Sequence, residues 1–138
     1  MTHFTPAVRA LQESHGSRAA YARHERESGP GEGLGAQESA FLSRADGFFL
    51  ATVGETGWPY VQHRGGPRGF LHVLGPGTLA FADYGGNRQL LSTGNLAADD
   101  RVALFLMDYR QRRRLKILGR ARVEPAAANP ELVRRLTT

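Results

Sequence analysis

Six short β-type segments at regular spacing constrain the fold of this chain more than any other feature of its sequence. Each segment is rich in β-branched, aromatic or aliphatic residues and is bounded by Gly, Pro, Asn or Asp turn signals. A doubly wound α/β fold would need a helix after nearly every strand, whereas only one short helix, at 89–92, is predicted between them. The pattern therefore predicts a mainly β domain with peripheral helices, arranged as an antiparallel barrel or sandwich. The predicted strands are 48–53, 58–64, 70–74, 78–83, 101–109 and 115–123.

Helices are predicted at both ends of the chain, and a Gly- and Pro-rich stretch at 28–36 separates the first of them from the rest. This composition is typical of a flexible linker. The sequence therefore predicts an N-terminal helical extension with its linker at residues 1–36, followed by the strand-rich domain at residues 37–138. The predicted terminal helices are 6–27, 37–44 and 131–136.

Composition excludes several kinds of protein. With 138 residues and no cysteine, the chain fits about one domain that holds neither disulfides nor thiolate-bound metal. No apolar run approaches the roughly 20 residues of a membrane span and no signal-type segment opens the chain, so we expect a cytoplasmic protein with no membrane partner. The net charge of +5 rests on 17 arginines and a single lysine, Lys116. That balance favours planar binding of phosphate or carboxylate, although a genome-wide preference for arginine would give the same count.

The turn after the fourth predicted strand has the layout of an anion site. Gly85 and Gly86 are followed by Asn87 and Arg88, where the short helix is predicted to begin. A helix start offers unpaired N–H groups, glycines allow a ligand to approach the backbone, and an arginine matches the shape of a phosphate. An Asn N-cap followed by one solvated arginine explains the same residues, so both interpretations stay open.

The chain resembles the flavin-binding split-barrel proteins related to pyridoxine/pyridoxamine 5'-phosphate oxidase, over about residues 37–138. The resemblance rests on three segments in order: FFLATVGETGWPYVQHRGG, LAFADYGGNRQLLSTGNLAADDRVALFLMDY and RRRLKILGRARV. It implies a six-stranded antiparallel split barrel that forms a homodimer and holds FMN in a cleft between the subunits. It also implies a small-molecule substrate.

The resemblance further implies which residues surround the flavin. The loop after the fourth strand would grip the phosphate, the second strand would line the ring and ribityl chain, and the end of the fourth strand would lie beside the ring. The start of the sixth strand would add a polar contact. The implied cofactor-binding residues are Gln62, His63, Arg64, Gly65, Ala82, Asp83, Asn87, Arg88, Gln89 and Arg114.

Three departures from the oxidases argue against the vitamin-oxidase activity more than against flavin binding. Pro67 stands where the oxidases have a substrate-binding lysine, and the neutral Gln89 follows the phosphate arginine where a basic residue is usual. The oxidases also continue beyond the helix at 131–136 into a segment that carries a tryptophan and an arginine beside the flavin.

The residues leave the catalytic groups unassigned. With no cysteine and no serine in a G-x-S-x-G turn, the chain offers no covalent nucleophile. The histidines form no H-x-x-x-H pair, so no metal site is expected. His63 is either a proton donor beside the flavin or a hydrogen-bonded structural residue. The RQRRR run at 110–114 is either a solvated hairpin tip or in part a phosphate contact.

Two classes of function remain. The first is an FMN-dependent oxidoreductase acting on a small substrate. The alternative is a non-catalytic split-barrel protein that binds a flavin, haem or a deazaflavin. Single-stranded nucleic acid is not an expected partner, because it would require exposed aromatics between the arginines. The aromatics Phe48, Phe81 and Phe105 instead lie in core-like runs.

Overall fold

The computed structural model describes residues 3–27, 33–83 and 91–137. The chain divides into two compact units, Met1–Gly33 and Leu34–Thr138.

The first unit contains two helices, α1 (Pro6–Ser14) and α2 (Arg18–Glu27), where the sequence predicted one helix over 6–27. Gly16 lies between them with a φ of 78°, in the left-handed region that glycine adopts without strain and that commonly ends a helix. The prediction of a single long helix is therefore wrong.

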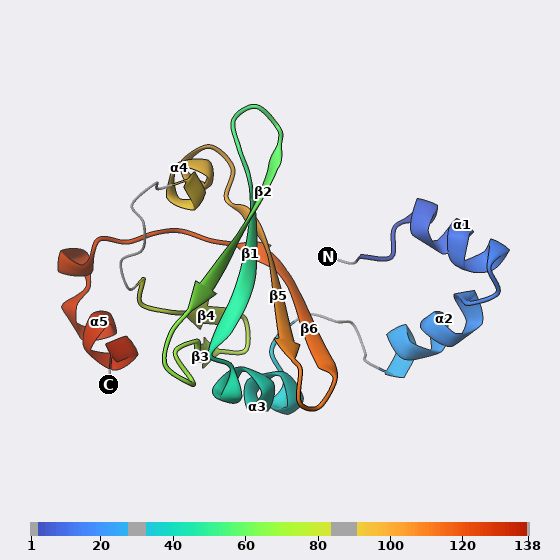
Figure 1. Cartoon of the computed structure of the whole chain (residues 1–138), viewed down its shortest axis with the longest axis horizontal. Helices are drawn as coiled ribbons and strands as arrows, with labels where there is room; N and C mark the ends of the chain where they lie inside the picture. The colour runs from blue at the N-terminus through green and yellow to red at the C-terminus, as the bar shows by residue number, and fades with distance from the viewer. Residues whose placement is uncertain (1–2, 28–32, 84–90, 138) are drawn as a thin grey trace. The chain divides into compact units, whose positions relative to one another are not determined.

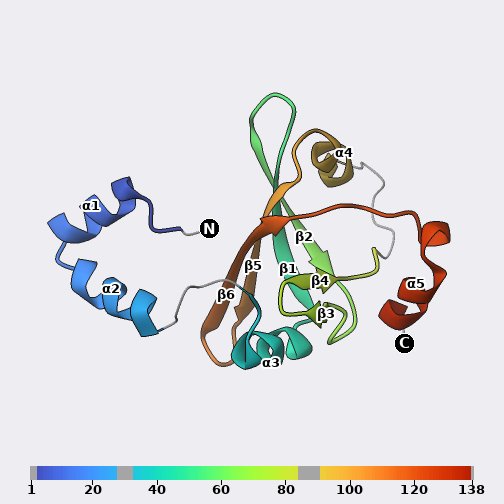
Figure 2. The same ribbon diagram turned by 180° about the vertical axis from the view of Figure 1, so that it is seen from behind.

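The second unit is built on two antiparallel sheets, one with the strand order β2-β1-β5-β6 and one formed by β3 and β4 (Figures 1 and 2). Within the described residues no ladder joins the two sheets, so a closed barrel is not seen there. The α-helices also hold more residues than the strands, so the chain is mixed α/β and not mainly β as predicted. The strands are β1 (Gly47–Val53), β2 (Pro59–Gly65), β3 (His72–Gly75), β4 (Thr78–Ala80), β5 (Arg101–Asp108) and β6 (Arg113–Arg120).

The boundaries differ from the prediction where tertiary contacts decide them. The third strand begins at His72 and not at residue 70, because Phe70 is a buried core residue outside the ladder. The helix predicted at 89–92 is α4 (Leu91–Ala98) in the described chain. Its Asn95 donates a hydrogen bond from Nδ2 to Thr52 Oγ1 at 3.0 Å, which ties the helix to β1. The other helices of this unit, α3 (Ala36–Arg44) and α5 (Pro130–Thr137), lie close to their predicted positions.

The two faces of the four-stranded sheet differ in what covers them. The inner face carries the alternate β1 side chains Phe48, Leu50 and Thr52, which are all buried. The opposite face, called the outer face below, carries Phe49 at 38% exposed and Val61 at 60% exposed. Because successive strand residues point to opposite faces, one buried face explains this alternation. The hydrophobic core on the inner face consists of Leu42, Phe48, Leu50, Phe70, Leu71, Val102, Leu104 and Leu106.

The helices of the second unit lie at different places around the sheet. In both views α4 lies beside the β1–β2 hairpin and α3 lies near the other end of β1 (Figures 1 and 2). No helix within the described residues combines the length and apolar character needed to cross a membrane.

Candidate functional site

The four predicted site residues of β2 divide between the two faces of the sheet. Arg64 pairs in register with Phe48 and Gln62 pairs with Leu50, so both lie on the inner face. His63 and Gly65 belong to the other set of alternate residues and lie on the outer face. Of the four predicted residues of β2, only Gln62 and Arg64 therefore lie on the same face and can contact one ligand together.

Arg64 is held against Asp83, which follows β4. Arg64 Nη1 donates to Asp83 Oδ1 at 2.5 Å, and the side chains are 19% and 51% exposed. Ala82, which precedes Asp83, is half-buried. Arg64 Nε is buried and has no hydrogen-bond partner among the described residues. Because an unsatisfied buried donor is unfavourable, this nitrogen marks a place where an acceptor is missing.

Gln62 is joined to the first turn of α4. Ser92 Oγ donates to Gln62 Oε1 at 2.9 Å, and Ser92 is only 1% exposed. The bond leaves the Gln62 amide nitrogen as a donor. Sequence reasoning missed Ser92, because the predicted helix ended there and no pattern related it to a residue thirty positions earlier. A contact between α4 and the sheet could have been predicted from Thr52, because it is a polar residue in the same buried alternation as Phe48 and Leu50.

Residues 83 and 92 are therefore both fixed beside β2. The segment between them includes Asn87, Arg88 and Gln89, and these three predicted phosphate contacts lie outside the described residues. The described flanks nevertheless show that the two ends of this segment meet the same strand, at Arg64 and Gln62.

His63 packs on the outer face against its cross-strand neighbour. The rings of His63 and Phe49 meet edge to face with centroids 5.3 Å apart. A Cβ placed on Gly47 would come within 2.8 Å of His63 Nε2, so the glycine makes room for the imidazole. The structure thus gives His63 a packing contact and separates it from Arg64 by the thickness of the sheet.

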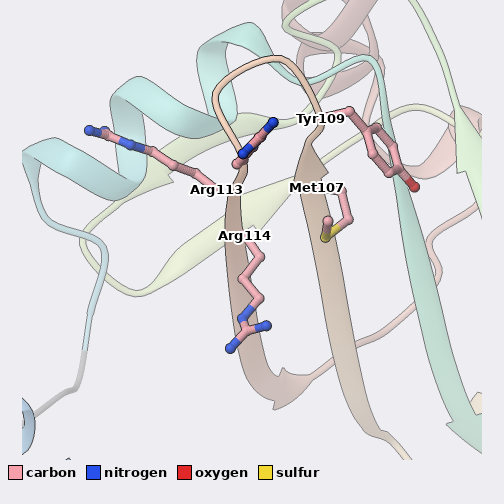
Figure 3. Close-up of a pocket in the computed structure, with 5 residues that line it drawn as sticks. Met107, Tyr109, Arg113 and Arg114 are labelled. Atoms are coloured by element: carbon pink, nitrogen blue, oxygen red, sulfur yellow. The ribbon is translucent and has the colours of Figure 1, made fainter. Parts of the chain in front are cut away.

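Arg114 lies far from the other predicted contacts within one chain. It is the ladder partner of Met107 on β5, and it belongs to β6, the opposite edge of the sheet from β2. It faces a hollow at the β5–β6 hairpin tip, and Figure 3 shows Arg114 beside Met107 with Tyr109 nearby. Three strand spacings, roughly 14 Å, separate β6 from β2. One chain therefore does not bring Arg114 to Gln62 and Arg64.

The described residues contain no group of three or more His, Asp or Glu side chains arranged to hold a metal ion. The polar groups beside β2 are instead a guanidinium, an amide, a hydroxyl and a carboxylate. This set suits an organic ligand that has both hydrogen-bond acceptors and donors.

These features define an antiparallel sheet domain with a polar cradle where β2 meets the end of β4 and the start of α4. A family model described as pyridoxamine 5'-phosphate oxidase matches residues 34–137. The chain belongs to this family. A search of curated proteins and a search of solved structures found no match.

Proposed function

We propose that the protein binds FMN and acts as an oxidoreductase on a small substrate. The observation that carries the proposal is the cradle of Gln62, Arg64, Asp83 and Ser92 in a chain of the pyridoxamine 5'-phosphate oxidase family. When bound, FMN supplies the electron transfer, and the protein binds it, orients it and tunes its electronics.

The donors and acceptors of the cradle fit the polar edge of an isoalloxazine ring, which offers two carbonyl oxygens, a basic nitrogen and one N–H group. The unpartnered Arg64 Nε and the Gln62 amide nitrogen would donate to ring acceptors. Asp83, half-exposed, would accept from the ring N–H while it holds Arg64 in place. A guanidinium close to the ring would also favour its anionic reduced form.

The phosphate of FMN would be held by Asn87, Arg88 and Gln89. Support comes from the described residues on either side, because Asp83 and Ser92 both bond to β2. Arg88 and neighbouring backbone N–H groups would suit the dianion, because a guanidinium and unpaired amides both bind phosphate.

The position of Arg114 supports a homodimer with one flavin at each of two shared sites. Arg114 lies on the outer face at the β6 edge, whereas Gln62 and Arg64 lie on the inner face at the β2 edge. The two sets would meet one flavin only if Arg114 came from a second copy. The exposed apolar residues of the outer face, Phe49 and Val61, provide a surface that a second copy would cover.

Titration of the FMN-free protein with FMN, followed by quenching of flavin fluorescence, tests the binding. Arg64→Gln and Arg88→Ala should each weaken FMN by about tenfold or more, because each loses charge-assisted hydrogen bonds. Arg122→Gln is the matched control, since Arg122 is exposed and its ion pair is with Glu124 and not with a residue of the cradle. Equal affinity in all three variants would reject the assignment.

Mixed dimers test the shared site. Arg64→Gln and Arg114→Gln should each weaken both sites of a homodimer. Subunit exchange between them would then restore one intact site in each mixed dimer, with half the flavin bound at the original affinity. If subunit exchange restores no flavin binding, Arg64 and Arg114 of the same chain contact the same flavin. Bleaching of bound flavin by NADH or NADPH would then identify turnover, and bound flavin that no reductant bleaches would favour the binding-only alternative.

A further inference from the structure

The β5–β6 hairpin tip holds a second candidate site that the cradle does not use. Its hollow has a volume of about 230 Å³ and is lined by Met107, Tyr109, Arg112, Arg113 and Arg114. In Figure 3 Met107 and Arg114 lie next to each other on the two strands, and Tyr109 projects from the end of β5. The hollow is large enough for a small ring with one charged substituent.

Among the described residues, the arginines of the hollow have no carboxylate partner. Elsewhere in the second unit Arg64, Arg101 and Arg120 each form an ion pair with an aspartate. Within the described residues, no carboxylate pairs with Arg112, Arg113 or Arg114. The nearby Asp108 instead accepts a hydrogen bond from the Gln111 backbone N–H at 3.0 Å and shapes the turn. Arg113 is the ladder partner of Asp108 and so lies on the other face of the hairpin from Met107 and Arg114, and Figure 3 shows its side chain directed away from Met107 and Tyr109. Arg112 and Arg114 are left beside the hollow with no described carboxylate, which favours an external anion.

The backbone at the tip is also unusual. Arg112 has a φ of 56°, and it is the only residue other than glycine with a positive φ in the described chain. Glycine would fit that position more easily than an arginine does. The hairpin turn imposes this conformation, so the chain keeps an arginine at a position where glycine would fit.

The hollow also has an apolar part. Tyr109 is 76% exposed and Met107 is 37% exposed, so both present carbon surface to solvent beside the arginines. A tyrosine ring and a thioether pack well against a planar apolar group. The site therefore suits a ligand with an anionic end and an apolar or aromatic body.

We propose that this hollow is the substrate's anion subsite, where Arg112, with Arg114 beside it, binds a phosphate or carboxylate while Tyr109 and Met107 contact the ring or chain that carries it. This inference rests on the proposed function, because Arg114 is both a wall of the hollow and the proposed flavin contact. The substrate's anionic end and the flavin would then lie on either side of Arg114.

Phenyl phosphate, benzoate and benzyl alcohol are the probes, titrated into uniformly ¹⁵N-labelled protein with and without FMN. Phenyl phosphate or benzoate should shift the amide signals of residues 107–114, and benzyl alcohol should bind about tenfold more weakly or not at all. Tighter binding of phenyl phosphate would assign a phosphate substrate, and tighter binding of benzoate would assign a carboxylate.

The variant Arg112→Gln should weaken the anionic probes about tenfold or more while FMN affinity stays unchanged. The control Arg113→Gln removes the same charge from the next residue, whose side chain lies on the other face of the hairpin, and it should bind both ligands normally. Equal loss in both variants would show an effect of net charge alone and overturn the subsite. An oligonucleotide such as dT15 that outcompetes phenyl phosphate at the tip would overturn it as well.

FMN binding in the same samples separates the two proposals. If the probes bind at the tip but FMN does not bind the protein, the flavin assignment fails and the tip remains an anion site without a role in flavin chemistry. If FMN binds and no anionic probe shifts residues 107–114, the subsite is wrong and the flavin assignment stands.

Discussion

At the β2 edge of the four-stranded sheet Arg64 is held by Asp83, whereas at the β5–β6 tip Arg112, Arg113 and Arg114 stand without a carboxylate among the described residues. The first arrangement fixes one guanidinium in a defined orientation, with its buried Nε still without an acceptor. The second leaves the Arg112 and Arg114 guanidiniums free to rearrange around an incoming group. We infer that the β2 edge suits a cofactor bound in one pose, and the tip suits a ligand that exchanges during turnover.

An ion pair with arginine also lowers the pKa of the carboxyl group, as the Arg101–Asp99 pair shows. The Arg101 side chain donates hydrogen bonds to both Asp99 carboxylate oxygens, at 3.0 and 2.6 Å. These bonds lower the pKa of Asp99 from 3.8 to about 2. A phosphate or carboxylate that entered the tip would be held in its charged form for the same reason.

The largest expected effect comes from Phe48, which supports the β2 edge but not the tip. Phe48 is the ladder partner of Arg64 and packs on Phe81 with ring centroids 5.2 Å apart. Phe48→Ala should lower the free energy of unfolding by about 3–5 kcal/mol, and Phe48→Leu by about 1 kcal/mol, measured by urea denaturation. In the folded fraction FMN affinity should fall while phenyl phosphate affinity at the tip is kept. Equal loss of both ligands would show that the two edges are not independent.

An intermediate effect is expected at the junction of β2 and α4. Ser92→Ala removes the donor to Gln62 from a buried position and should lower the free energy of unfolding by about 1–3 kcal/mol. Ser43→Ala is the control, because the exposed Ser43 hydroxyl bonds only to the Ala40 carbonyl of its own helix, and it should change stability by less than about 0.5 kcal/mol. Similar stability of the two variants would mean that the Gln62–Ser92 bond does not position the helix.

Local patterns predicted much of the sheet, because side chains facing one core alternate along a strand. The run from Phe48 to Val53 and its return strand could be identified from this period and from the turn between them. The third strand could not be delimited, because Phe70 is as apolar as a strand residue although it packs into the core outside the ladder. The bounds of α4 could not be predicted either, because Gly94 and Asn95 disfavour a helix in isolation.

The candidate site shows the same limit. Resemblance named Arg64 and Asp83 separately, but nothing in the sequence joined residues nineteen positions apart into an ion pair. The run from Gln62 to Gly65 was predicted as one lining, and strand alternation divides it between two faces. The hairpin arginines were predicted with two interpretations, and only the folded hairpin gathers Arg112 to Arg114 with Met107 and Tyr109 around one hollow.

The smallest expected effect separates stability from binding at the tip. Arg112→Gly places glycine where φ is 56°, so the relief of backbone strain should roughly offset the greater freedom of the unfolded chain. Its unfolding free energy should stay within about 1 kcal/mol of the original, with any change toward higher stability. Arg113→Gly, one residue later in β6, should lose about 0.5–1 kcal/mol because glycine weakens a strand. Arg112→Gly should also bind phenyl phosphate more weakly in the NMR titration, whereas Arg113→Gly should bind it normally because that side chain lies on the other face of the hairpin. If Arg112→Gly instead keeps full affinity, the arginine serves only the turn, and the contrast between a paired edge and a receptive tip would rest on Arg114 alone.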